Sequence, residues 1–101
     1  MAIADEMPAK AENVAAFLKG LASQHRLLIL CALAEGERSV TQLIEETRIP
    51  QTSMSQHLAK LKEERIVDFR REHRTLFYRI VHPAAGEVMD VLFRHFCAGS
   101  G

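Results

Sequence analysis

Two groups of side chains in this sequence are suited to chemistry: a pair of thiols and a run of hydrogen-bonding residues. The thiols belong to Cys31 and Cys97. Two cysteines are too few for the disulfide framework of a small secreted domain, and in a reducing compartment they begin as free thiols. A bond between them would therefore act as a signal rather than as a structural brace.

The hydrogen-bonding residues lie on one predicted helix, over residues 51–64. Met54, Leu58 and Leu61 follow helical spacing and define its inward face. The outward face carries polar side chains: Gln51, Thr52, Ser53, Ser55, Gln56 and Lys60. Glutamine can bind adenine through two hydrogen bonds, and serine or threonine can bind several bases. A polar outward face at the start of a helix is typical of a recognition helix in the major groove of DNA.

Basic residues follow this helix. The whole chain is neutral, with 13 Lys and Arg against 13 Asp and Glu, so only the distribution of charge can favour a polyanion. Within residues 60–79 the basic side chains outnumber the acidic ones. Contacts to the DNA backbone are predicted for Lys60, Arg70, Arg71 and Arg74. His57 is predicted to lie beside the groove or the DNA backbone. The plain alternatives are a solvated hairpin and a partly exposed histidine with no special role.

The elements that position these residues follow from hydrophobic periodicity. The spacing predicts helices over residues 11–19, 24–35, 40–46, 51–64 and 84–97. After Ile66 the period changes to two, which predicts two strands joined near residues 72–74. Two short helices joined by a tight turn and followed by a hairpin are typical of a winged helix-turn-helix. We therefore expect a mostly helical fold with a small β-hairpin, in the order ααααββα.

Local signals fix several helix boundaries. Ser23 and Ser39 are expected N-caps, and Pro50 suits the first position of the helix that follows it. The helix after Ser23 has one apolar face, formed by Leu27, Leu30, Cys31 and Ala34 and broadened by Leu28 and Leu33. Cys31 is thus expected on the apolar side of a core helix, where a free cysteine is often only a small hydrophobe.

The last helix carries more apolar surface than packing inside so small a monomer requires. Its apolar residues are Val88, Met89, Leu92, Phe93 and Phe96. This excess favours a homodimer over the alternative in which the whole face packs within one chain.

Length and composition limit the class of protein. The 101 residues fit one domain, residues 1–101, whose ends at 1–10 and 98–101 we expect to be flexible. Hydrophobic residues at 48% and charged residues at 26% exclude a disordered tail, a collagen-like repeat and a coiled-coil rod. The first residues do not resemble a signal peptide, and the longest apolar run, residues 27–34, is too short to cross a bilayer. We expect a cytoplasmic protein with no membrane partner.

Four stretches of the chain resemble the ArsR/SmtB family of bacterial transcriptional repressors. They are residues 21–30, 39–43, 54–61 and 70–80, of which S-Q-H-L-x-x-L at residues 55–61 is the most specific. The likeness extends over residues 14–97. It implies a homodimer, built from the first and last helices, that binds an inverted repeat in double-stranded operator DNA. The two recognition helices would lie roughly 34 Å apart, one turn of DNA.

The resemblance also implies what the protein senses. Metal-sensing members use a cysteine pair in the third helix or carboxylate and histidine ligands in the last helix. The third-helix stretch here, residues 39–43, has no thiol, and Asp90 and His95 are five apart, so we expect no metal site. The poor alternative is a metal site formed by His82, Asp90 and His95. No cofactor is expected.

The cysteines match a persulfide-sensing branch of the family, typified by SqrR and BigR. Members of this branch have one cysteine on the second helix and one at the end of the last helix. Reactive persulfides link the two thiols through a disulfide or polysulfide bridge, and the repressor releases DNA. The resemblance implies this role for Cys31 and Cys97, with a persulfide or polysulfide as effector. A direct disulfide requires closely spaced Cα atoms, whereas inserted sulfurs relax that demand.

Three other hypotheses remain open at this stage. The first keeps the repressor but makes a metal ion or a general oxidant its trigger. The second is a thiol-redox enzyme, which fits badly because the chain has no C-x-x-C and no alternation of strands and helices. The third is a module that binds protein through its winged helix. Salt-dependent binding to duplex DNA separates the repressors from the other two. We expect no enzymatic activity.

The chain departs from many relatives at two turns. Many have glycine where Arg65 stands, at a helix end that often needs a left-handed backbone. Many metal-sensing relatives also have glycine in the wing tip, where this chain has Glu72 and His73. Near Cys97, Arg94 favours the thiolate whereas the helix C-terminus disfavours it.

Overall fold

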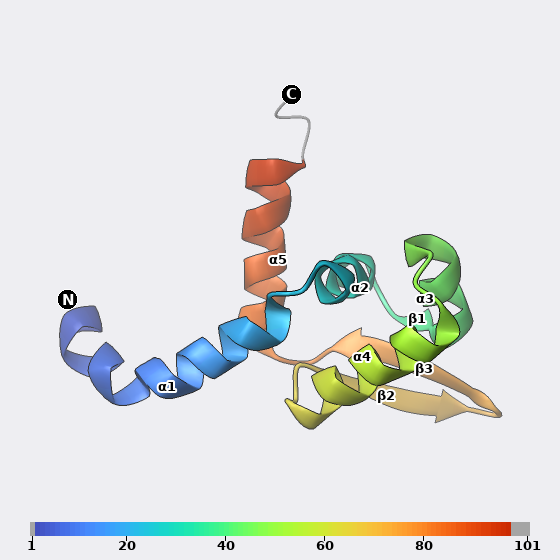
Figure 1. Cartoon of the computed structure of the whole chain (residues 1–101), viewed down its shortest axis with the longest axis horizontal. Coiled ribbons are helices and arrows are strands. Elements are labelled where there is room, and N and C mark those ends of the chain that lie inside the picture. The colour runs from blue at the N-terminus through green and yellow to red at the C-terminus, as the bar shows by residue number, and fades with distance from the viewer. Residues whose placement is uncertain (1, 98–101) are drawn as a thin grey trace.

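The fold is a winged helix-turn-helix, as the sequence predicts (Figure 1). The computed structural model describes residues 2–97, and the predicted fraying of residues 98–101 lies outside them. The elements are α1 (Ile3–Leu21), α2 (Gln24–Ala34), β1 (Arg38–Ser39), α3 (Val40–Thr47), α4 (Gln51–Glu63), β2 (Val67–Glu72), β3 (Thr75–Ile80) and α5 (Pro83–Phe96).

The hairpin belongs to a three-stranded antiparallel sheet in the order β1-β3-β2. Strand β1 was not expected, so the predicted order ααααββα lacks one element. Its two residues pair as Arg38 with Tyr78 and Ser39 with Phe77. Two residues are too few to show an alternating pattern, which is why periodicity missed the strand. Between β2 and β3 the register leaves a two-residue turn at His73 and Arg74.

A single hydrophobic core lies between α2, α4 and the sheet. The predicted inward residues of α4, Met54, Leu58 and Leu61, are all buried. With them the core contains Leu21, Ile29, Leu30, Leu33, Leu43, Ile49, Ile66, Val67, Tyr78, Ala85 and Met89. Burial of three side chains one turn apart fixes which face of α4 is turned to solvent.

The N-caps of α2 and α3 are confirmed. Ser23 Oγ accepts a hydrogen bond from the backbone N–H of Arg26 at 3.3 Å. Ser39 and Gln42 form a reciprocal capping box, with bonds of 3.1 and 2.8 Å. Pro50, in contrast, is the N-cap of α4 rather than its first residue. Its extended backbone allows α4 to begin directly after the turn.

The predicted start of the first helix is wrong. Helix α1 begins at Ile3 rather than at residue 11, so residues 3–10, which were expected to be flexible, form helix. Pro8 lies inside α1 and cannot donate a backbone hydrogen bond to the preceding turn. Figure 1 shows the first turns of α1 at an angle to the rest of the helix.

The predicted face of α2 is also partly wrong. Its buried residues are Ile29, Leu30 and Leu33, whereas Cys31 and Ala34 are exposed. The helix is apolar around most of its circumference, so its own spacing does not decide which side meets the core. The packing of α3, α5 and the sheet decides it.

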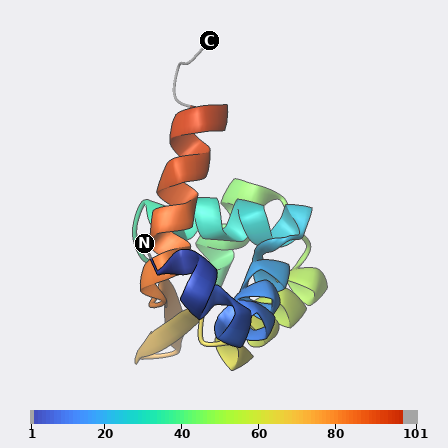
Figure 2. The ribbon, with the colours of Figure 1, turned by 90° about the vertical axis from the view of Figure 1, so that its left-hand side faces the viewer.

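Helix α5 projects away from the rest of the molecule (Figure 2). Met89 is buried, but Phe93 and Phe96 are 55% and 78% exposed. Ile3 and Leu18 of α1 are 58% and 49% exposed. No single helix within residues 2–97 is long and apolar enough to span a membrane. The pair α1 and α2 passes such a test only together, and the two meet at 86°.

Candidate DNA-binding surface and thiol pocket

The polar face of α4 is presented to solvent. Gln51, Thr52, Ser55 and Gln56 are exposed, and Ser53 is half-buried. Gln51 and Ser55, and likewise Thr52 and Gln56, are separated by four residues, so they form two adjacent rows along the helix. The first two turns of α4 therefore carry an array of donors and acceptors over a firmly buried inner face.

His57 lies against α2. Its half-buried ring accepts a hydrogen bond at Nδ1 from Arg26 Nε at 3.4 Å. The ring also meets His25 edge to face, with centroids 5.3 Å apart. Burial, then the charge of Arg26 and then His25, lower the pKa of His57 below its ordinary value. The structure thus gives His57 contacts with Arg26 and His25, and its place beside the DNA groove or backbone stays a prediction.

Arg26 joins three helices. Besides its bond to His57 in α4, Nη1 donates to the carbonyl of Gly20 at the end of α1, at 3.3 Å. Sequence reasoning missed this cluster because Arg26 and His57 are 31 residues apart. The one signal that could have indicated this cluster is an arginine placed directly before the apolar part of α2, where its side chain needs a polar partner.

The predicted basic residues of the wing fall into two groups. Arg70 is bound to Glu37 at 3.0 Å and to Glu72 at 2.9 Å, and its guanidinium lies 4.7 Å from the Phe77 ring centroid. The hydrogen bonds that Arg70 donates to Glu72 and Glu37 raise the pKa of Arg70 above its usual value. Arg71 and Arg74 are exposed and have no ion pair within residues 2–97.

Lys60 is paired as well. Its Nζ lies 3.3 Å from Glu63 Oε1 and 3.7 Å from Glu64 Oε2. These pairs are solvent-exposed and contribute little stability, so a phosphate can compete for the ammonium group. Figure 1 shows the N-terminal end of α4 and the tip of the β2–β3 hairpin toward the same end of the molecule.

The structure brings the two thiols together. Cys31 on α2 and Cys97, the C-cap of α5, are free and exposed and line one cavity of about 450 Å³. The remaining wall is made by Ala34, Glu35, Gly86, Met89, Asp90 and Phe93. The cavity opens between the last turns of α2 and one side of α5, and its lining is mainly apolar with two carboxylates at the rim.

The surroundings of Cys31 oppose its ionisation. Burial of its sulfur, then Cys97 and then Glu35, raise the pKa of the Cys31 thiol. Arg94, which was expected to favour a thiolate at Cys97, has its Nε 3.2 Å from Asp90 Oδ2. The positive charge of Arg94 is therefore partly neutralised.

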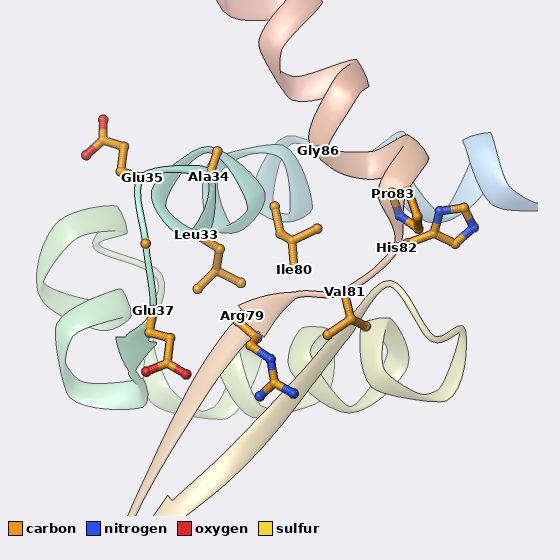
Figure 3. A pocket seen from close by; sticks show the side chains of 11 residues that line it. Leu33, Ala34, Glu35, Glu37, Arg79, Ile80, Val81, His82, Pro83 and Gly86 are labelled. Carbon is orange, nitrogen blue, oxygen red and sulfur yellow. The ribbon is translucent and has the colours of Figure 1, made fainter.

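A second cavity of about 460 Å³ adjoins the thiol pocket (Figure 3). The two share Ala34, Glu35 and Gly86 as lining residues. His82 lies at its α5 end, where its Nδ1 accepts the backbone N–H of Ala84 at 3.1 Å. Through this bond His82 serves as the N-cap of α5.

The poor metal site formed by His82, Asp90 and His95 does not assemble. Within residues 2–97 no three histidine, cysteine or carboxylate side chains converge in a way that could hold a metal ion. Asp90 is occupied by Arg94, and His82 caps its helix.

A short helix and a polar helix joined by a tight turn, with a two-stranded wing beside them, define a winged helix-turn-helix DNA-binding protein. The chain belongs to the arsR family of bacterial regulatory proteins: the family match covers residues 23–68, and relatives match beyond it. This confirms the family that the sequence motifs indicated.

Named relatives match nearly the whole chain. The biofilm growth-associated repressor of Agrobacterium fabrum is 42% identical over 92 residues, which are 91% of this chain and 79% of that protein. The transcriptional activator HlyU of Vibrio cholerae is 34% identical over 91% of this chain and 85% of its own length.

Solved structures agree with this fold. The transcriptional repressor BigR from Xylella fastidiosa superposes with a TM-score of 0.86 at 38% identity, covering 93% of this chain and 96% of that one. Reduced HlyU from Vibrio cholerae superposes with a TM-score of 0.87 at 33% identity, covering 92% of this chain and 98% of that one.

Proposed function

We propose that this protein is a homodimeric transcriptional repressor that releases operator DNA when reactive sulfur species bridge Cys31 to Cys97. The observation that carries the proposal is the shared cavity, which is lined by two free thiols from α2 and from the end of α5. The relatives named as repressors support the repressor role. A regulator of this kind works in the cytoplasm, where the chromosome lies.

The operator is double-stranded DNA with an inverted repeat. In the proposal, α4 enters the major groove, and Gln51, Thr52, Ser55 and Gln56 bind base edges. Ser53 and His57, which are half-buried, lie beside the groove or the DNA backbone in the proposal. Arg71 and Arg74 bind phosphates directly, whereas Lys60 and Arg70 must first leave their carboxylate partners.

The dimer is proposed to form through α1 and α5. Phe93 and Phe96 on α5, and Ile3 and Leu18 on α1, leave an exposed apolar surface that a monomer gains nothing from keeping. A twofold interface of these helices covers it and sets the two copies of α4 one turn of DNA apart.

The bridging chemistry needs only a persulfide, RS–SH. The raised pKa of Cys31 makes that thiol the slower nucleophile, so in the proposal Cys97 reacts first, through its thiolate form. It attacks the outer sulfur of RS–SH, forms Cys97–S–SH and releases RS⁻. Cys31 loses its proton to water and attacks the sulfur attached to Cys97, which gives Cys31–S–S–Cys97 and releases HS⁻. If Cys31 also carries an added sulfur, the same step gives a trisulfide. The sulfane sulfur is the oxidant throughout.

Bridging can reach the recognition helix through α2. Cys31 and Arg26 both lie on α2, and Arg26 binds His57 of α4. Drawing the end of α5 toward Cys31 changes the contacts of α2 and, in the proposed dimer, the position of one protomer against the other. Allosteric release then requires that the bridged and reduced states differ in their DNA contacts.

The experiment is DNA binding by the reduced protein on its own promoter, with intact mass recorded in parallel. Separate samples receive glutathione persulfide, glutathione disulfide or zinc. Release with persulfide alone, with sulfur linking Cys31 to Cys97 in one chain, supports the proposal. Release by glutathione disulfide makes the trigger a general oxidant, and release by zinc with unchanged thiols moves the sensor elsewhere. A reduced protein that binds no duplex in any sample overturns the repressor assignment.

A further inference from the structure

Three residues other than glycine have a left-handed backbone within residues 2–97: Arg48, Arg65 and His73, with φ of 65°, 62° and 59°. Side chains with a Cβ are disfavoured in this conformation, and glycine adopts it freely. All three carry basic or titratable side chains, and all three lie at turns that flank α4 or the wing. Each is therefore a place where the fold alone favours a different residue.

The turn at Arg48 is held rigidly on both sides. Arg48 is the C-cap of α3, and its N–H donates to Ile44 at 2.8 Å. Thr47 Oγ1 donates to the carbonyl of Leu43 at 2.6 Å and accepts the N–H of Ile49 at 3.2 Å. Ile49 is only 2% exposed. These contacts fix the backbone and point residue 48 outward.

The side chain of Arg48 is exposed and makes no hydrogen bond or ion pair within the described chain. Of the two carboxylates in the last turns of α3, Glu46 is already bound by Arg38 at 2.9 Å. Arg48 is two residues before the N-cap of α4. Figure 1 shows the α3–α4 turn at the end of the molecule toward which the hairpin tip points.

We propose that Arg48 binds a backbone phosphate at the edge of the major groove that α4 enters. This inference rests on the proposed DNA binding and adds a contact outside the polar face and the wing. A guanidinium suits the role because its planar fork holds two phosphate oxygens and stays charged. The rigid turn holds the arginine backbone in place before DNA arrives, which limits the entropy lost on binding.

Arg65 provides a matched control. It has the same side chain and nearly the same φ, but it follows the opposite end of α4. It lines a groove together with Glu63 and Asp68, whose negative charges make this part of the surface less favourable for a phosphate. Arg48→Gly and Arg65→Gly each remove one positive charge, and each removes the strain of an arginine with a left-handed backbone.

The test compares the two variants with the wild type by fluorescence anisotropy, in reduced form, over a range of salt. The DNA is the protein's own promoter and a duplex of unrelated sequence. We expect Arg48→Gly to weaken binding to both duplexes by a similar factor, about tenfold at low salt, since phosphate contacts carry no sequence information. The slope of log affinity against log salt should fall by about one. Arg65→Gly should bind as the wild type does.

Thermal unfolding completes the test. Both glycine variants should melt at or above the wild-type temperature, because glycine adopts the same left-handed backbone without the strain that a Cβ causes. Lower affinity in a protein that is no less stable separates a lost contact from a damaged fold. Unchanged DNA affinity in Arg48→Gly, or an equal loss in Arg65→Gly, overturns the inference. Failure of the wild type to bind either duplex would instead overturn the proposed function.

Discussion

Arg26 Nε donates a hydrogen bond to His57 Nδ1 across 3.4 Å and so joins the helix that carries Cys31 to the helix that presents the polar face. The acceptor must be an unprotonated nitrogen, which places the ring proton of neutral His57 on Nε2. Protonation of His57 removes the acceptor and puts two positive charges next to each other. The contact between α2 and α4 is therefore sensitive to pH.

Stability should fall on acidification through His57. Its pKa is lowered in the folded protein, so between its ordinary value near 6.5 and the lower folded value the unfolded chain binds more protons. The contribution of His57 is complete above that window and is lost as pH falls through the folded pKa. Urea unfolding from pH 7.5 to 5 measures it. His57→Gln, which keeps an acceptor but does not titrate, should flatten this part of the curve, and an unchanged pH profile would contradict the assignment.

The two groups of wing arginines should contribute unequally to DNA binding. Arg74→Ala removes an exposed cation that has no described partner, so affinity should fall about tenfold and the salt slope by about one. Arg70→Ala should cost less, because Arg70 must give up Glu37 and Glu72 before it can bind a phosphate. Anisotropy titrations at several salt concentrations compare them. A larger loss in Arg70→Ala than in Arg74→Ala would show that the ion pairs do not compete with DNA.

Glu35 should slow the reaction of Cys31. Its negative charge is one cause of the raised pKa of that thiol, so Glu35→Gln should increase the thiolate fraction at neutral pH. Glu35 is largely exposed, and we expect only about a twofold faster alkylation, shrinking as salt is added. The rate is measured by iodoacetamide mass shift in a Cys97→Ser background. A slower or unchanged rate at low salt would mean that the charge of Glu35 does not act on Cys31.

The apolar end of α5 should hold the dimer together. Phe96 is 78% exposed in the single chain, so Phe96→Glu should leave the fold intact and shift the mass in solution from twice 11.4 kDa toward one chain. Light scattering after size exclusion measures the mass. Val81→Glu is the control, since Val81 is also exposed, at 41%, but lies outside α1 and α5. Equal effects of the two substitutions on the mass in solution would contradict a dimer interface at this end of α5.

Local signals predicted much of this fold because they act over a few residues. The caps at Ser23 and Ser39 and the buried stripe of α4 depend on neighbours within four positions, and they are confirmed. Strand β1 depends on a partner far along the chain and was missed, and for the same reason the buried face of α2 was predicted only in part. The helical start at Ile3 was missed as well, because the first residues were expected to be flexible.

The same distinction applies to the site. Residue types on α4 indicated a DNA-binding face without any long-range information. Which cations are free could not be predicted, because Arg70 is bound by Glu37 from 33 residues away. The burial around Cys31 likewise arises from α5, far along the chain. The proposed phosphate contact of Arg48 could not be predicted from the sequence, because it is inferred from the left-handed φ of that residue.

The most direct test of the account is DNA affinity before and after glutathione persulfide in the wild type, Cys31→Ser and Cys97→Ser. Persulfide should weaken wild-type binding at least tenfold, and the intact mass should show an intramolecular bridge. Both serine variants should bind DNA when reduced and keep that affinity after treatment, since neither can close the bridge. Release of DNA by either single variant, or a bridged wild type that stays bound, would contradict the central claim.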